Sequence, residues 1–282
     1  MAGKVINEVI KLKSARDTDI YTGVMVPALE RNEKAPLVIL AHGFMGNKDE
    51  NGLFSGGVFD MPGAADQLLT LGIASVRIDF PGTGDSAESF ENYTMDNMLG
   101  DLDVVYRHML ENDSVDPGRV AILGWSMGGK VAALFVDNHP EIGTMLLWAP
   151  AAGNGTDDLD KALSSFGTDL QATAMRDGKA LMNSPFPDKT FYISKEFFTS
   201  LDGCKPMESI NNYKGNKMFI YGTADSAIPA RIYQDLISKT DIGYLSVEGA
   251  DHDFGADGTN NPVQAKTLFD TTISYLYKHL MA

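Results

Sequence analysis

A serine between two glycines is the strongest chemical signal in the sequence. Residues 124–128 read G-W-S-M-G, directly after the strand-like run 120–123 and directly before the helix-like run 130–136. Glycines let the chain pass close on both sides of a serine that is held in a sharp strand-to-helix turn. The pattern predicts that Ser126 is a nucleophile raised above a sheet. The alternative is an ordinary glycine-rich turn between a strand and a helix.

A nucleophilic serine needs a general base and a carboxylate that orients the base. The strand-like run 217–221 leads into Asp225, and the next strand-like run, 242–247, leads into His252. Parallel strands end at one edge of a sheet, where ligands bind. We therefore expect Asp225 to orient His252 as the base, in the chain order Ser, Asp, His. Asp251 and Asp253 are alternative carboxylates, but a neighbour in sequence rarely faces the histidine ring.

Other residues that could do chemistry carry weaker signals. Cys204 lies in a loop with neither a base nor an elbow, and one cysteine cannot form an intramolecular disulfide. No histidine or cysteine spacing is typical of a metal site, so we expect neither metal nor cofactor. Residues 82–87 match the nucleotide fingerprint G-x-G-x-x-A, but Pro81 interrupts the strand exit and no helix starts directly after the glycines. Structural roles are expected for His108, His139 and His279.

Strand-like and helix-like runs alternate along the chain, which predicts an α/β fold with a mostly parallel sheet covered on both faces. The run 95–111 has apolar residues at helical spacing, which indicates a helix packed on one face. An antiparallel pair is expected at 6–12 and 20–26. Further strands are expected at 37–41, 73–80, 120–123, 145–148, 217–221 and 242–247, and helices at 63–71, 95–111, 130–136 and 262–280.

From its early strands to its last helix, the chain resembles the serine hydrolases of the α/β-hydrolase fold. H-G-F at 42–44, the loop 79–86, the serine elbow, Asp225 and His252 carry the resemblance. Within this fold it is most similar to small esterases that include cinnamoyl and feruloyl esterases. The shared motifs are H-G-F-x-G at 42–46, G-x-G-x-S at 82–86, A-P-A-A at 149–152 and E-G-A-D-H at 248–252. The chain departs from these esterases at Trp125 and Met127, where histidine and glutamine are common.

The resemblance implies an eight-stranded α/β-hydrolase core formed by residues 1–150 and 208–282, with a cap inserted at 151–207. It also implies an oxyanion hole made by the backbone N–H groups of Phe44 and Met127. His42 is then expected to brace the loop rather than to transfer protons.

Aromatic residues near the elbow and in the cap are candidates for substrate binding, because ligand pockets are mostly apolar. Cap aromatics could equally pack the cap against the core, and Phe197 and Phe198 belong to the same set. The candidates are Trp125, Phe166, Phe186, Phe191 and Tyr192.

The composition of the 282 residues, 44% of them hydrophobic, fits one large domain. The net charge of −15 argues against nucleic acid and anionic membranes as partners. No apolar run reaches the length of a membrane span, and the first residues contain no apolar stretch typical of a secretion signal. We expect a cytoplasmic protein, and a homodimer is compatible with the sequence.

The expected function is hydrolysis of a carboxylic ester through an acyl-enzyme, with a small-molecule ester of a hydrophobic or aromatic acid as substrate. Three alternatives stay open. An acyl-peptide or prolyl-type peptidase or a thioesterase would use the same triad. A binding protein with this fold would use none of it.

Overall fold

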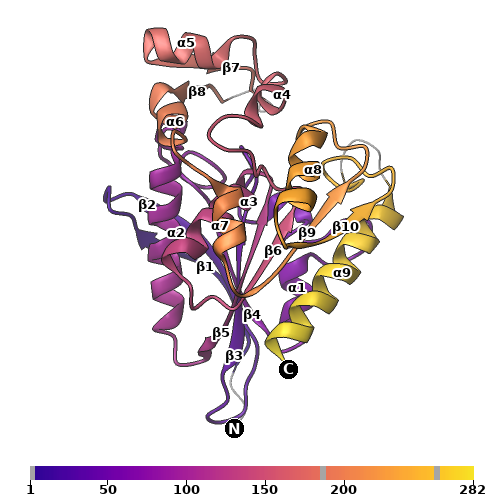
Figure 1. Ribbon diagram of the computed structural model, residues 1–282. Helices are drawn as coiled ribbons and strands as arrows, with labels where there is room; N and C mark the ends of the chain where they lie inside the picture. The colour runs from indigo at the N-terminus through magenta and orange to yellow at the C-terminus, as the bar shows by residue number, and fades with distance from the viewer. Residues whose placement is uncertain (1–3, 185–188, 257–260) are drawn as a thin grey trace.

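An eight-stranded sheet runs through the middle of the structure (Figure 1). The computed structural model describes residues 4–184, 189–256 and 261–282. The order of the strands across the sheet is β1-β2-β4-β3-β5-β6-β9-β10. Strand β2 pairs antiparallel with β1 and β4, and the remaining neighbours pair in parallel. The strands are β1 Ile6–Lys13, β2 Asp19–Val26, β3 Ala35–Ala41, β4 Ala74–Ile78, β5 Val115–Trp125, β6 Thr144–Trp148, β9 Asn216–Gly222 and β10 Gly243–Val247.

Helices cover both faces of this sheet, as the sequence predicts. One face carries α2 (Met95–Leu110), α3 (Met127–Asn138), α7 (Pro206–Asn212) and α8 (Ala230–Lys239), and the other carries α1 (Ala64–Thr70) and α9 (Pro262–Leu280). The side chains of β3 alternate between the two cores, with Leu37 and Ile39 in one and Val38 and Leu40 in the other. A strand that is apolar at every position is the expected signature of a parallel sheet buried on both faces.

Local capping fixes where the long helices begin. The Thr94 side chain accepts the N–H of Asn97 at the start of α2. The Asn261 side chain accepts the N–H of Val263 at the start of α9, where Pro262 occupies the first turn. Both arrangements satisfy N–H groups that have no partner inside the helix.

Several short elements lie between β6 and β9. They are α4 (Leu159–Leu163), α5 (Leu170–Asp177), β7 (Lys179–Met182), β8 (Phe191–Ser194) and α6 (Lys195–Ser200), followed by α7. Figure 1 shows α4, α5 and the β7–β8 pair above the carboxyl edge of the sheet, whereas α7 lies beside α3. β7 and β8 pair antiparallel, and the Ser194 hydroxyl donates to the Glu91 carbonyl in the 3-10 turn η2 (Phe90–Asn92). The cap boundaries at 151 and 207 stay a prediction.

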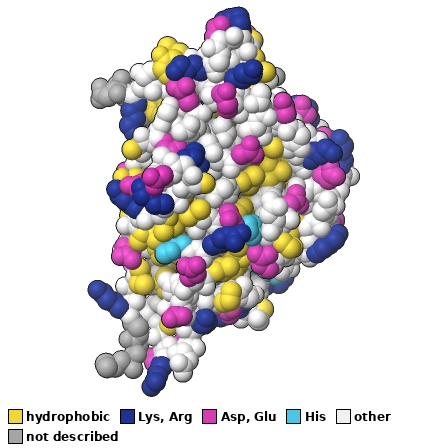
Figure 2. Space-filling view, turned by 90° about the vertical axis from the view of Figure 1, so that its left-hand side faces the viewer, with side chains coloured by type: hydrophobic (Ala, Val, Ile, Leu, Met, Phe, Trp, Pro, Cys, Tyr) yellow, Lys and Arg dark blue, Asp and Glu magenta, His cyan; other side chains and the backbone are white. Residues whose placement is uncertain are grey.

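The surface mixes both signs of charge. Figure 2 shows a face on which acidic and basic side chains lie side by side, with apolar patches between them. In the described part of the chain, no helix combines the length and the apolar character needed to cross a lipid bilayer.

Candidate active site

Ser126 occupies the sharp turn between β5 and α3 with φ 55° and ψ −115°. A side-chain-bearing residue seldom adopts a positive φ, and such strain is typical of functional turns. The positions two residues before and two residues after Ser126 have no room for a side chain. A Cβ at Gly124 would lie 2.2 Å from the Gly128 carbonyl oxygen, and a Cβ at Gly128 would lie 2.0 Å from the Ala41 carbonyl oxygen. The two glycines are therefore required by the close packing of β3, β5 and α3.

Asp225 and His252 follow β9 and β10 and are hydrogen-bonded to each other. The distance from His252 Nδ1 to Asp225 Oδ2 is 2.8 Å. The Asp225 side chain is 1% exposed and that of His252 is 17% exposed, so the pair is anchored at its carboxylate end and open at its imidazole end. Of the three carboxylates considered from the sequence, Asp225 is the one that holds the His252 ring.

The Asp225 carboxylate has a well-filled set of hydrogen bonds. Its Oδ1 accepts the N–H groups of Ala227 (2.7 Å) and Ile228 (3.0 Å), and its Oδ2 accepts the Tyr233 hydroxyl at 2.6 Å. Burial raises the pKa of the Asp225 carboxyl, but its hydrogen bonds, led by the one from His252, outweigh burial and bring the pKa below its ordinary value. The carboxylate therefore stays ionised beside the imidazole at neutral pH.

Sequence reasoning did not find Tyr233. This residue lies in α8 with Ile232 and Leu236 on the buried face of the helix. A buried tyrosine hydroxyl usually has a hydrogen-bond partner. The position of Tyr233 on the apolar face of a helix is therefore the sequence signal that could have indicated its role.

Trp125 connects the serine turn to the histidine loop. Its indole Nε1–H donates to the His252 carbonyl at 3.3 Å, and the centroids of the two rings are 5.4 Å apart. Ser126 and His252 are thereby on touching loops. Among the described residues no hydrogen bond joins the Ser126 hydroxyl to the His252 ring. Such a bond is often long before substrate binds, and here it stays a prediction.

The loop after β3 passes directly over the serine turn. A Cβ at Gly43 would lie 3.1 Å from the Trp125 ring and 3.4 Å from Ser126 Cβ. The next residue is Phe44. Within the described part of the chain, neither the Phe44 N–H nor the Met127 N–H has a hydrogen-bond partner. Their role as an oxyanion hole stays a prediction.

His42 braces this loop, as expected. Its Nδ1 lies 2.7 Å from the Gly43 carbonyl oxygen, and its Nε2 accepts the Phe80 N–H at 3.1 Å. Burial lowers the pKa of His42 to about 4. A neutral ring whose Nδ1–H and Nε2 are both engaged in hydrogen bonds has no free nitrogen with which to transfer a proton at neutral pH.

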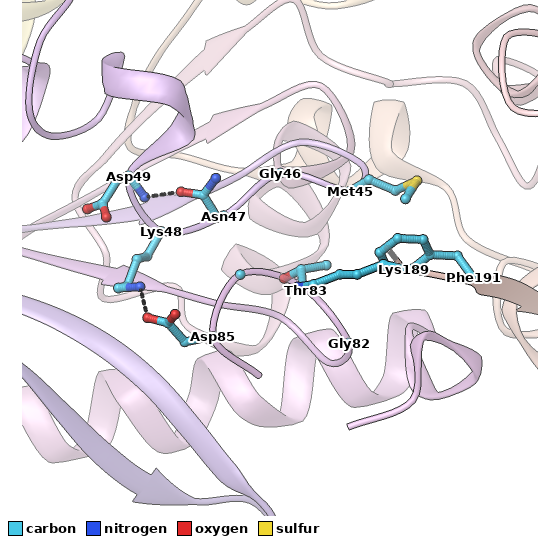
Figure 3. Close-up of a pocket in the computed structure, with 11 residues that line it drawn as sticks. Met45, Gly46, Asn47, Lys48, Asp49, Gly82, Thr83, Asp85, Lys189 and Phe191 are labelled. Carbon is cyan, nitrogen blue, oxygen red and sulfur yellow. Dashed lines mark hydrogen bonds and ion pairs between the residues drawn. The ribbon is translucent and has the colours of Figure 1, made fainter. Parts of the chain in front are cut away.

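The same loop borders a pocket of about 370 Å³ whose described lining includes neither Ser126 nor His252. Figure 3 shows the Lys48 ammonium directed at Asp85 at one end and Met45 and Phe191 at the other. Lys48 Nζ is 2.6 Å from Asp85 and 3.1 Å from Asp79, so a paired cation forms the polar end of this pocket.

Aromatic rings surround the side chain of Phe44. The centroids of Phe90, Tyr93, Phe166 and Phe197 lie between 5.4 and 5.8 Å from that of Phe44. Phe166 and Phe197 come from the segment between β6 and β9. The predicted residue Phe166 is thus placed against the loop that carries the candidate oxyanion donor.

Of the other cap candidates, Phe191 adjoins this cluster and Tyr192 does not. Phe191 packs edge-on against Phe90 at 5.6 Å. Tyr192 points to the opposite face of β8, where it is exposed and lies under the Lys179 ammonium at 4.5 Å. This position separates Tyr192 from the aromatic cluster. Phe186 lies outside the described residues.

Comparison with known proteins links this geometry to a family. The family described as "Serine aminopeptidase, S33" matches residues 32–185, which is more than half of the chain. No curated protein matches the sequence.

Solved structures share the fold at low sequence identity. Est1E from Butyrivibrio proteoclasticus, solved with bound ferulic acid, has a TM-score of 0.77 and 16% identity over 97% of this chain and 100% of its own. A putative hydrolase from Agrobacterium vitis has a TM-score of 0.71 and 20% identity over 97% and 99%. A puromycin-hydrolyzing peptidase of Mycobacterium tuberculosis has a TM-score of 0.69 and 13% identity over 98% of this chain and 39% of its own.

Proposed function

Because the chain belongs to the serine aminopeptidase S33 family of α/β hydrolases, we propose that it is a serine carboxylic ester hydrolase. The strongest support is the buried Asp225 carboxylate, which lies 2.8 Å from Nδ1 of the His252 imidazole. Trp125, the residue before Ser126, donates a hydrogen bond to the His252 carbonyl and so links the two loops. A strained serine, an oriented imidazole and two free backbone donors are the parts that acyl transfer requires.

The proposed reaction begins with attack of Ser126 Oγ on the ester carbonyl. His252 donates its Nδ1–H to Asp225, which leaves Nε2 as the end of the ring that takes the serine proton. The carbonyl oxygen becomes an oxyanion and accepts the N–H groups of Phe44 and Met127. The protonated imidazole then gives its proton to the leaving alcohol. Water, activated by the same imidazole, hydrolyses the acyl-enzyme.

The aromatic cluster supports a hydrophobic or aromatic acyl group as the substrate. Phe166 and Phe197 lie against Phe44, beside the proposed oxyanion hole. Phe44 and Phe166 are only partly buried, so their rings would pack on an acyl chain or aryl ring and offer little to a sugar, whereas Phe197 is buried inside the cluster. The ferulic acid bound to the structurally similar Est1E is consistent with this choice. A cytoplasmic location is part of the proposal; a single cysteine, which can form no intramolecular disulfide, suits such a reducing compartment.

Hydrolysis of aminoacyl amides is the second candidate, and the description of the matching family favours it. The same serine, base and donors would serve an amide. A thioester substrate would also fit. A substrate panel separates these activities.

The proposal is tested by initial rates on p-nitrophenyl esters from acetate to octanoate, methyl ferulate, an acyl thioester and aminoacyl p-nitroanilides. We expect turnover of esters, and a loss of at least about 10⁴-fold in kcat/KM for Ser126→Ala, because the nucleophile is gone. Ser238→Ala, which removes an exposed hydroxyl of α8, is the matched control and should behave as wild type.

Ester turnover that survives in Ser126→Ala would contradict the proposal. Preference for the anilides over every ester would replace it with the peptidase. No turnover of any substrate would favour a binding protein.

A further inference from the structure

Glu50 is a buried acid enclosed by the loop that carries Phe44. The residue is 1% exposed, and its Oε2 accepts the Gly43 N–H at 2.8 Å. The turn closes around it, because the Gly46 N–H donates to the Gly43 carbonyl and a Cβ at Gly46 would lie 2.5 Å from both carboxyl oxygens of Glu50. The carboxyl group therefore fills the inside of the turn that presents the Phe44 N–H.

The backbone around Glu50 is held in strained conformations. Met45, Glu50 and Asn51 all have positive φ, at 58°, 46° and 50°. The Asn47 side chain accepts the N–H groups of Asp49 and Glu50 at 2.9 and 3.1 Å. Strain of this kind persists where the surrounding contacts over-determine it, and it is concentrated at functional sites. The hydrogen bond between Glu50 and Gly43 is one of those contacts.

Lys48, two residues before Glu50, and Arg77, which pairs with the adjacent Asp49, both have other carboxylate partners. Lys48 pairs with Asp79 and Asp85, and Arg77 pairs with Asp49. Among the described residues, no lysine or arginine forms an ion pair with Glu50. A buried carboxyl without a cation is most stable in its neutral form.

The groups that face Glu50 from other elements add to this preference. The carboxylates of Asp253, after β10, and Asp79, after β4, both disfavour a second negative charge. The Tyr93 hydroxyl also lies near Glu50, and its pKa is raised by burial and by Glu50. Burial, assisted by Asp253 and Asp79 and opposed by the Gly43 N–H, raises the pKa of Glu50 to about 8.

We propose that Glu50 is a positioning residue which, as a neutral acid, holds the Phe44 N–H aimed at the oxyanion, and that its ionisation switches hydrolysis off in alkaline solution. This inference rests on the proposed function. A carboxylate inside the turn would place a negative charge next to the site where the transition state also becomes negative, which weakens the stabilisation that the N–H groups provide.

The test is the dependence of kcat and KM on pH between 6 and 9.5 for a neutral ester, corrected for spontaneous hydrolysis. In wild type, kcat should fall once pH passes about 8, approaching but not exceeding about tenfold per pH unit, because a single group ionises. Glu50→Gln keeps an acceptor for Gly43 but cannot ionise, so this alkaline fall should vanish. Glu50→Ala leaves the buried N–H unpaired and should lower kcat about 10- to 100-fold at pH 7, with KM changed less than about threefold.

A matched control is Asp101→Asn, which makes the same chemical change at a buried acid that pairs with Arg16 instead of the loop. Its pH profile should keep the shape of the wild-type profile. Circular dichroism before each assay confirms that every variant is folded.

A stability measurement reads the ionisation of Glu50 without any turnover. The pKa of Glu50 is raised from 4.5 in the unfolded chain to about 8 in the fold. Wild type should therefore lose stability relative to Glu50→Gln as pH rises from 4.5 towards 8. An alkaline fall of kcat that persists in Glu50→Gln, wild-type kcat in Glu50→Ala, or a stability difference that does not change with pH would each overturn the inference. Absence of ester turnover in wild type, together with the expected stability difference, would instead overturn the proposed function and with it the catalytic role of Glu50.

Discussion

The Tyr233 hydroxyl and the His252 imidazole share one oxygen of the Asp225 carboxylate, while two backbone N–H groups hold the other oxygen. Four donors on one buried carboxylate fix its orientation in a way that the imidazole contact alone would not. A charge that is satisfied by several donors is also stabilised against burial. This single residue therefore sets the direction of the His252 ring.

His42 provides a test of stability against pH at the scale of one residue. The pKa of His42 is about 4 in the fold and 6.5 in the unfolded chain. Between pH 6.5 and 4 the imidazole is therefore protonated in the unfolded chain but neutral in the folded protein. The stability contributed by the neutral ring is complete above pH 6.5 and is lost as pH falls towards 4, by up to about 3 kcal/mol.

We expect the free energy of unfolding in urea to fall more steeply between pH 6.5 and 4 in wild type than in His42→Gln. His108→Gln, at an exposed position of α2, is the control and should follow wild type. Parallel curves for wild type and His42→Gln would contradict a buried neutral ring.

Ser126, Asp225 and His252 could be proposed as a triad from the sequence because each follows a strand and the three types occur in a chemically required order; the structure places Asp225 against His252. Tyr233 and Glu50 could not be located in this way. Their importance depends on which group the folded chain places opposite them, Asp225 in one case and the Gly43 N–H in the other. A sequence of this kind indicates candidate reacting groups much better than the groups that hold them.

At the scale of elements, a buried ion pair ties α3 to the start of the segment between β6 and β9. Lys130 Nζ donates to the carbonyls of Gly153 and Gly155 and lies 3.0 Å from Asp158 Oδ1, with both side chains of the pair fully buried. Three acceptors match the three hydrogens of the ammonium group. Lys130 lies one helical turn after Ser126 in α3. The pair thus anchors residues 153–158, at the start of the inserted segment, to the helix that follows the serine.

Removing one partner of this pair should be costly, because it leaves an unpaired buried charge. We expect Lys130→Met to lower the free energy of unfolding by about 3–5 kcal/mol in urea titrations. The double variant Lys130→Met/Asp158→Leu should recover much of that loss. Lys266→Met, at an exposed pair with Asp270, should cost less than about 1 kcal/mol. Equal effects at the buried and exposed pairs would show that the buried pair has no special role.

Most elements of the sheet could be predicted, and the segment above it could not. The last helix runs from Pro262 to Leu280, as expected from an N-terminal proline and a long apolar pattern. Strands β7 and β8 are four residues each, too short for a period-two pattern to stand out. Their position depends on contacts such as the one between Ser194 and Glu91, which join residues far apart in the chain.

At the scale of the whole molecule, the aromatic cluster joins the sheet to the segment above it. Phe44 comes from the loop after β3, and its partners Phe166 and Phe197 come from the inserted segment. The candidate oxyanion loop is therefore packed between the two parts of the protein. Substrate selection and the geometry of the hole are expected to depend on the same contacts.

The central claim is that Ser126 is an activated nucleophile, and reaction with a fluorophosphonate probe tests it most directly. Intact-mass spectrometry followed by peptide mapping would locate any adduct. We predict one adduct per chain on the peptide that contains Ser126, no adduct in Ser126→Ala, and strongly slowed labelling in His252→Ala, because the base that activates the serine is missing. An unlabelled wild-type protein, or labelling that persists in Ser126→Ala, would contradict the account.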